Sequence, residues 1–159
     1  KLEKLFLDRN AISEVVGLDN CYALQELHIA HQRLPEGVEL TFDEVSLAAV
    51  SHSLEVLNVA GNNMTSLRQI RHLRRLVSLN ATKNRIAEPA DALAVFETCE
   101  GLEQLDVRDN PLTKTAKYWD NMVLGSPLTF RKLDGKRIEP KQREFLMRFE
   151  VHKARTGRG

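Results

Sequence analysis

One apolar frame, L-x-x-L-x-L-x-x-N-x-L, recurs five times along this chain of 159 residues. In the second copy Gln32 takes the Asn position, and other apolar residues replace some of the Leu residues. The matching positions are Leu2, Leu5, Leu7, Asn10 and Ile12; Leu24, Leu27, Ile29, Gln32 and Leu34; Leu54, Leu57, Val59, Asn62 and Met64; Leu76, Leu79, Ala81, Asn84 and Ile86; and Leu102, Leu105, Val107, Asn110 and Leu112. Agreement at so many fixed positions predicts a stack of similar units in which each unit contacts its neighbours.

The frame is that of the leucine-rich repeat. It predicts an α/β solenoid, a horseshoe with a parallel concave sheet, convex helices and a C-terminal cap. In each repeat the L-x-x-L-x-L segment forms a short strand whose apolar side chains point inward, while the alternate residues face the concave surface. The Asn amide both donates and accepts hydrogen bonds, so stacked Asn side chains satisfy backbone groups in the turns. Gln32 breaks this series, and we expect a local irregularity there.

The repeat lengths predict where helices cover the convex side. The first Leu positions of successive frames are 22, 30, 22 and 26 residues apart. The two longer repeats have room for helices, which we expect near 43–51 and 89–98. In the first, Thr41 and Glu44 form a T-x-x-E capping box, and in the second Pro89 suits the first helical position. Residues 33–40 are expected to form a loop.

The chain departs from the repeat after Asn110, and this departure predicts a cap. A bulky helical stretch comes first, followed by a degenerate sixth frame through Phe130, Leu133 and Ile138 and a last helix that begins at Pro140. An open solenoid needs a cover over its last apolar layer. The residues expected to supply that cover are Tyr118, Trp119, Met122, Phe130, Leu133 and Phe145.

The predicted organisation divides the chain into two parts. Residues 1–138 hold the five frames and the degenerate sixth, and residues 139–159 hold the last helix and a basic tail that is expected to be disordered from 152 onward. At the other end, Lys1 stands directly on a strand frame. We expect a fragment that lacks N-terminal repeats. The alternative is an edge strand protected by the charges of Lys1, Glu3 and Lys4.

Composition and charge agree with a single soluble unit. With 42% hydrophobic residues, the chain has no apolar run near the roughly 18 residues of a membrane span, and no signal peptide is recognisable. The net charge of +1 conceals a basic end, because residues 131–159 hold 10 Lys and Arg against 4 Asp and Glu. This end either contacts acidic surfaces or is simply solvated. Cys21 and Cys99 are expected to be free, buried thiols, since three strand layers separate them.

The sequence has no pattern typical of an enzyme. It contains no glycine-rich phosphate loop, nucleophile elbow or C-x-x-C pair. His28 and His31 form an H-x-x-H, but a strand places them on opposite faces, and no acidic or Cys partner completes a metal site. Asp134 and Gly135 are typical of a turn. We therefore predict no catalytic residue, no metal, no cofactor and no small-molecule substrate.

The candidate binding surface consists of the alternate strand residues, which cannot be buried while their apolar neighbours are. An exposed aromatic side chain such as Phe6 is the kind of residue that anchors protein interfaces. The predicted concave residues are Lys4, Phe6, Asp8, Glu26, His28, Val56, Asn58, Ser78, Asn80, Gln104, Asp106 and Arg108. This surface predicts that a monomeric solenoid binds a protein partner.

Several less common stretches give a narrower resemblance. They are Gln-Arg-Leu-Pro at 32–35, Leu-Asp-Gly-Lys at 133–136, and Arg143 with Phe145, Leu146 and Met147. Over nearly the whole chain, the sequence resembles the sds-type repeat subfamily, which includes the leucine-rich-repeat regulatory subunits of protein phosphatase 1, the testis form among them. The resemblance implies a cytoplasmic regulator at microtubules and centrosomes, with the phosphatase catalytic subunit and tubulin as partners. Nucleic acid is not an expected partner.

The chain differs from many phosphatase partners in one respect. It lacks their short motif of a basic residue, Val or Ile, any residue, and then Phe or Trp. Binding to the phosphatase would then use the concave face or repeats outside this sequence. Two other functions fit the same repeats, namely a ciliary or axonemal structural adaptor and a splicing-complex scaffold like the leucine-rich-repeat subunit of a small nuclear ribonucleoprotein.

Overall fold

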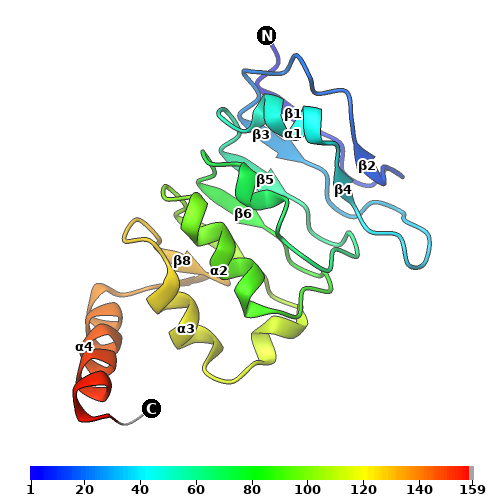
Figure 1. The fold of residues 1–159 in the computed structure, drawn as a ribbon. Helices are drawn as coiled ribbons and strands as arrows, with labels where there is room; N and C mark the ends of the chain where they lie inside the picture. Colours follow the sequence, from blue (N-terminus) through cyan, green and yellow to red (C-terminus); the bar gives the residue numbers. More distant parts are fainter. Residues whose placement is uncertain (158–159) are drawn as a thin grey trace.

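The fold is a curved stack of short parallel strands with helices on the outer side (Figure 1). The computed structural model describes residues 1–157. Seven strands of this part form one sheet in the order β1 Lys4–Phe6, β3 Glu26–His28, β5 Val56–Asn58, β6 Ser78–Asn80, β7 Gln104–Asp106, β8 Lys132–Leu133 and β9 Lys136–Arg137. Strands β1 to β8 of this sheet run parallel, and β9 pairs antiparallel with β8. The predicted leucine-rich-repeat solenoid is confirmed.

Strand register brings equivalent repeat positions side by side. One such row comprises Leu5, Leu27, Leu57, Leu79, Leu105 and Leu133. All of these except Leu5, which is half-buried, are shielded from solvent. Burying a Leu side chain contributes about 2 kcal/mol, so each repeat is stabilised by its contact with the next.

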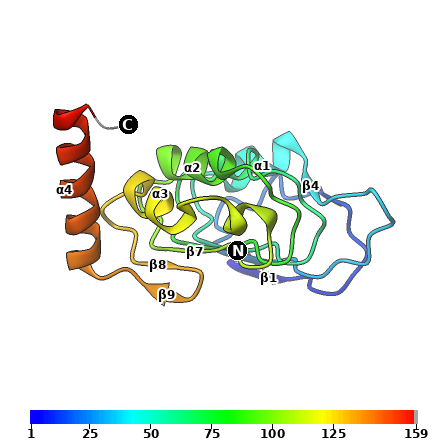
Figure 2. The same ribbon diagram turned by 90° about the horizontal axis from the view of Figure 1, so that it is seen from below.

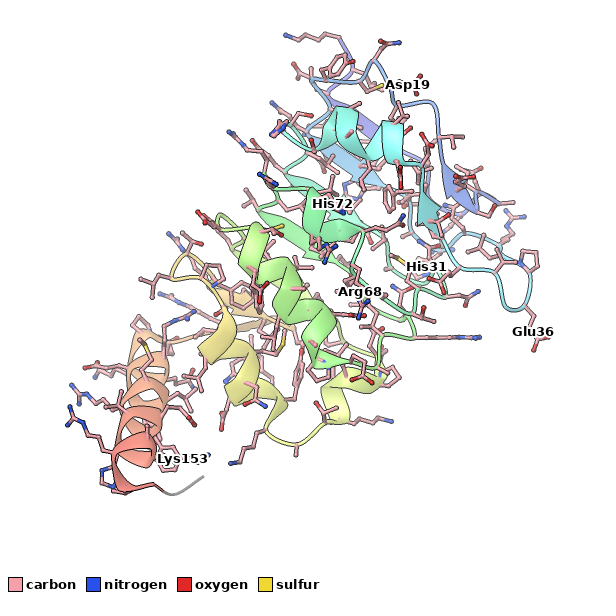
Figure 3. The ribbon with its side chains drawn as sticks, in the orientation of Figure 1. Asp19, His31, Glu36, Arg68, His72 and Lys153 are labelled. Atoms are coloured by element: carbon pink, nitrogen blue, oxygen red, sulfur yellow. The ribbon has the colours of Figure 1, made fainter. Side chains whose placement is uncertain are left out.

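Helices and irregular segments cover the convex side of the sheet, as Figure 2 shows. These elements are α1 Glu44–Val50, η1 Ile70–His72, α2 Pro89–Thr98, η2 Pro111–Lys114 and α3 Tyr118–Gly125, with a small parallel sheet of β2 Glu14–Val15 and β4 Thr41–Phe42. Both predicted convex helices are present, and α2 has the predicted bounds. The expected loop at 33–40 is confirmed, and Glu36 lies near its tip (Figure 3).

The helix in the longest repeat is capped differently from the prediction. Thr41 is not the N-cap, because it lies in β4, where its backbone N–H donates to the Ser13 carbonyl at 3.0 Å. Asp43 takes that position, and its Oδ2 accepts a hydrogen bond from the Ser46 backbone N–H at 3.1 Å. Pairing of β4 with β2 therefore moves the cap to the next suitable side chain.

A ladder of amide side chains joins the turns that follow the strands. Asn62 is fully buried, and its Nδ2 donates to the Ile29 and Val59 carbonyls at 2.8 and 3.1 Å. Its Oδ1 accepts a hydrogen bond from the Gln32 backbone N–H at 2.9 Å. Asn84 and Asn110 make the corresponding bonds one and two repeats further on. The side chains thus satisfy turn backbone groups that would otherwise be buried without partners.

The irregularity expected at Gln32 is absent from the described chain, so that prediction was wrong. Gln32 Nε2 donates to the Leu7 carbonyl at 2.8 Å, and its Oε1 accepts from the Ile12 backbone N–H at 3.0 Å. The longer side chain reaches backbone groups equivalent to those that Asn62 and its successors reach. The second repeat therefore keeps its place in the ladder.

The C-terminal cap contains most of the predicted residues but not Phe145. Met122, Phe130 and Leu133 are buried, and Tyr118 and Trp119 pack against the core while half-exposed. Phe145 is 67% exposed, so its predicted sealing role is wrong. It belongs to α4 Pro140–Thr156, which stands at the end of the solenoid beside α3 (Figure 2) and contacts it there.

The tail and one cysteine also differ from expectation. Residues 152–156, which were expected to be disordered, continue helix α4, while Arg158 and Gly159 lie outside the described residues. Both cysteines are free, as predicted. Cys99 is buried and its Sγ donates to the Leu73 carbonyl at 3.2 Å, but Cys21 is half-buried rather than buried.

The amide ladder gives a stability prediction. Replacing Asn62 with Ala leaves the Ile29 carbonyl and the Gln32 N–H buried without partners, and we expect a loss of about 3 kcal/mol in the free energy of unfolding. Urea denaturation followed by circular dichroism measures this loss. The matched control is Asn121→Ala on the exposed side of α3, which should change stability by less than about 0.5 kcal/mol. Equal effects of the two substitutions would contradict the ladder's structural role.

Candidate protein-binding surface

The concave face is formed by two rows of side chains that cross five strands. Lys4, Glu26, Val56, Ser78 and Gln104 align in the first row, and Phe6, His28, Asn58, Asn80 and Asp106 align in the second. Asp8 and Arg108 follow the ends of β1 and β7. In every one of these strands the central Leu is the least exposed residue. The structure thus brings all twelve predicted residues to one face.

An aromatic and charged cluster occupies the β1 end of this face. The Phe6 side chain is 62% exposed, and its ring stacks on that of His28 with centroids 4.8 Å apart. Glu26 lies between the His28 imidazole, with Nε2 at 2.7 Å, and the Lys4 ammonium group, with Nζ at 3.2 Å. The hydrogen bond with His28 and then that with Lys4 lower the pKa of Glu26. The cluster therefore presents the exposed Phe6 ring on the His28 imidazole, which is held in place by Glu26.

The centre of the face offers amide donors. Asn58 Oδ1 accepts a hydrogen bond from the Ala60 N–H, and Asn80 Oδ1 accepts one from the Thr82 N–H, both at 3.1 Å. These bonds hold the two amides in defined orientations. Within residues 1–157 their Nδ2 atoms have no hydrogen-bond acceptor, so they are free to donate to a bound molecule.

A fixed ion pair occupies the β7 end. Arg108 donates to Asp106 through two nitrogens, with Nη2 at 2.6 Å from Oδ2 and Nε at 3.0 Å from Oδ1. The Asp106 carboxylate raises the pKa of Arg108. A hollow of about 200 Å³ lies beside this pair, and its wall includes Lys132 of β8. Lys132 is not among the predicted concave residues, although it precedes Leu133 in the degenerate sixth frame as Gln104 precedes Leu105.

The turn predicted at Asp134 and Gly135 is confirmed and supports this end. It joins β8 to β9, with φ of 52° at Asp134 and 78° at Gly135. Asp134 Oδ1 accepts from the Val107 N–H at 2.8 Å, and its Oδ2 accepts from the Tyr118 hydroxyl at 2.7 Å. Burial raises the pKa values of both Asp134 and Tyr118. Asp134 thus connects the β8–β9 turn to helix α3 and to the segment after β7, and these bonds stabilise the hairpin.

Residue types needed for metal binding are dispersed in the described structure. Residues 1–157 contain no group of three His, Cys, Asp or Glu side chains that could hold a metal ion. His28 belongs to the concave cluster, whereas His31 is exposed in the turn after β3 (Figure 3). No helix in this part of the chain has the length and apolar character needed to cross a bilayer.

Comparison with known proteins agrees with this geometry. No protein-family model matches the chain. U2A′ in the crystal structure of the Drosophila melanogaster SNF/U2A′ complex superimposes with a TM-score of 0.72, covering 95% of this chain and 87% of that one at 19% identity. The chain has the leucine-rich-repeat fold.

Two further matches are more limited. Toll-like receptor 10 from Bos taurus is 35% identical over 79 residues, which make up 48% of this leucine-rich-repeat chain. The chain spans only 10% of the length of that receptor. A chain of the Chaetomium Mex67:Mtr2 structure aligns with 60% of this chain and 68% of its own, with 21% identity and a TM-score of 0.49.

The cluster at the β1 end gives a prediction about ionisation. His28→Leu should raise the pKa of Glu26 toward its usual value of 4.5, because the carboxylate loses its strongest hydrogen bond. A pH titration of the Glu26 side-chain carboxyl by NMR measures this change. His72→Leu removes an exposed imidazole from the convex side and serves as the control, with no effect on Glu26 expected. An unchanged Glu26 pKa in His28→Leu would show that the two side chains are not paired.

Proposed function

We propose that this protein is a scaffold that binds a folded protein partner on its concave face, in the manner of a splicing-complex subunit. The proposal depends on one observation, the two continuous rows of side chains between the Phe6 cluster and the Arg108–Asp106 pair. An exposed aromatic at one end and a bidentate ion pair at the other are features of interface hot spots. The named partner of the structural neighbour U2A′ is itself a protein, SNF, which supports the same class of function.

The chemistry of the face indicates the kind of partner surface that fits. Amide donors in the middle require acceptor groups on the partner, and the exposed Phe6 ring requires an apolar pocket or a flat apolar patch. Charges of both signs lie on the face, since Glu26 and Asp106 are paired with Lys4 and Arg108. A folded domain with a mixed polar surface satisfies these requirements better than a uniformly charged polymer such as nucleic acid.

Regulation of protein phosphatase 1 is the second candidate function. It is supported by the resemblance to the sds-type regulatory subunits, and it carries the expectation of a cytoplasmic protein at microtubules and centrosomes that contacts tubulin. Two of the residues on which this resemblance is based stabilise the fold itself. Gln32 is part of the amide ladder, and Arg143 donates hydrogen bonds to carbonyls at the end of the solenoid. Similarity at these positions therefore follows from fold requirements as readily as from a shared partner.

The test is a binding measurement with both purified candidates, SNF and the phosphatase 1 catalytic subunit, against the immobilised chain. Phe6→Ala should weaken binding of the true partner about 30-fold or more, since an interface anchor contributes at least about 2 kcal/mol. Tyr22→Ala, at a 69% exposed ring outside the concave rows, is the matched control and should have no effect.

The two candidates are distinguished by which protein binds. Binding of SNF alone supports the scaffold proposal, and binding of the phosphatase alone supports the second candidate. If Phe6→Ala and Tyr22→Ala bind a captured partner equally well, the concave face is not the binding surface.

A further inference from the structure

Helix α4 exposes an unusual amount of apolar surface. Met147, Phe149 and Val151 are each at least half exposed, as is Phe145, and no residue of the helix is buried. Scattered exposed apolar residues are normal, but these four form two pairs at four-residue spacing on different flanks of the helix, Phe145 with Phe149 and Met147 with Val151, and such paired exposure requires an explanation. In both ribbon views α4 lies at the end of the solenoid, beside α3 (Figures 1 and 2).

The helix is well formed and held in place. Its first turn has a capping box between Glu139 and Gln142, and Gly157 ends it in the left-handed conformation. Arg143 fastens it to the solenoid by donating hydrogen bonds to the Val123 and Phe130 carbonyls at 2.9 and 3.0 Å and to Ser126 Oγ at 3.0 Å. The exposed side chains are therefore displayed on a fixed support and do not belong to a frayed end.

A groove of about 520 Å³ runs along one flank of α4. Met147 and Val151 supply its apolar surface, and Glu144, Arg148 and Arg155 lie on the same flank, where Arg148 pairs with Glu144 and Arg155 adds a further positive charge. At Pro140 and Arg143 it meets a second hollow of about 710 Å³, which extends to Lys132 at the edge of the concave face. The two hollows thus share two lining residues in the first turn of α4.

The charge of α4 identifies the class of ligand. The helix carries five Lys and Arg residues against two Glu residues, including Lys153 (Figure 3). Lys132 and Arg137 add positive charge along the second hollow. A second copy of this chain would place one cationic helix against another, which like-charge repulsion disfavours. A partner with acidic residues and an apolar stripe would complement both the positive charge of α4 and the apolar side chains of Met147 and Val151.

We propose that α4 is a second docking site, which binds an acidic amphipathic helix of a partner protein in the groove at Met147 and Val151. The 17 residues of α4 span about 25 Å, so a partner helix of similar length can lie along it. Apolar side chains of the partner, spaced at three and four residues, would contact Met147 and Val151, while its acidic residues face Arg148 and Arg155. This site goes beyond the concave face and does not rest on the function proposed for that face.

The experiment uses fluorescence anisotropy with a labelled peptide of about 18 residues, in which Leu recurs at helical spacing and Glu fills the other positions. We expect the full chain to bind this peptide, and to bind it more weakly as salt concentration rises. Met147→Ser combined with Val151→Ser should weaken binding at least about tenfold, as should Arg148→Glu combined with Arg155→Glu. All four residues lie on exposed positions, so the melting temperature should stay unchanged.

Matched controls lie on the convex side. Val45→Ser removes an apolar side chain that is 60% exposed on α1, and Arg71→Glu with Arg74→Glu reverses two exposed charges near η1. Neither control should alter binding. A peptide of the same composition with a shuffled order tests whether helical amphipathicity matters, and it should bind at least about tenfold more weakly.

Several results would overturn the proposal. Equal binding of the shuffled peptide would reduce the interaction to charge alone, and tighter binding of a single-stranded RNA oligonucleotide would make α4 a nucleic-acid surface. Dimerisation of the chain in sedimentation experiments, abolished by the Met147 and Val151 substitutions, would assign the groove to a second copy. Loss of peptide binding in Phe149→Ser but not in the Met147 and Val151 variant would place the site on the opposite flank.

Discussion

The buried amide ladder is the interaction on which the rest of this structure depends. Strands of three residues make few hydrogen bonds with their neighbours, and the turns that follow them carry backbone groups away from water. Asn62 and its equivalents satisfy those groups and connect each turn to the next. In the part of the chain that the structure describes, no buried side-chain nitrogen or oxygen is left without a partner. The register fixed in this way aligns the two concave rows.

The C-terminal end of the stack replaces the ladder with a different arrangement. Asp134 accepts hydrogen bonds from the Val107 backbone N–H, just after β7, and from the Tyr118 hydroxyl. Strand β9 then pairs antiparallel with β8. Strand β9 consists of Lys136 and Arg137, both exposed. Charged side chains on an edge strand discourage pairing with another sheet. Arg137 also lines the hollow that shares Pro140 and Arg143 with the α4 groove, so this residue both protects the edge and adds positive charge to that surface.

The concave face follows from the fold, but the choice of the partner proposed to bind it does not. Any strand that buries its central Leu must display the neighbours of that Leu, so a concave face exists in every such solenoid. In the function proposed above, partner choice depends on what occupies the displayed positions, here the ring of Phe6 stacked on His28 and the Arg108 side chain paired with Asp106. A shared leucine-rich-repeat fold therefore does not imply a shared partner.

The sequence by itself determined the features that depend on periodicity. Repeat spacing was sufficient for the fold class, the strand positions, the bounds of α2 and the composition of the two concave rows, because inward and outward residues alternate strictly along a strand. The turn at Asp134 and Gly135 was equally readable, since both residues tolerate positive φ.

Only the tertiary structure decided the features that depend on contacts between distant residues. Gln32 keeps the ladder because the Leu7 carbonyl, 25 positions away, lies within its reach. Asp43 replaces Thr41 as a cap because β2 engages β4. Phe145 is exposed because Arg143 and Leu146 determine which strip of α4 meets the solenoid. An apolar stripe in the sequence indicates that a helix has a face that favours burial. Whether that face packs against the rest of the same chain depends on how the anchoring residues, here Arg143 and Leu146, orient the helix.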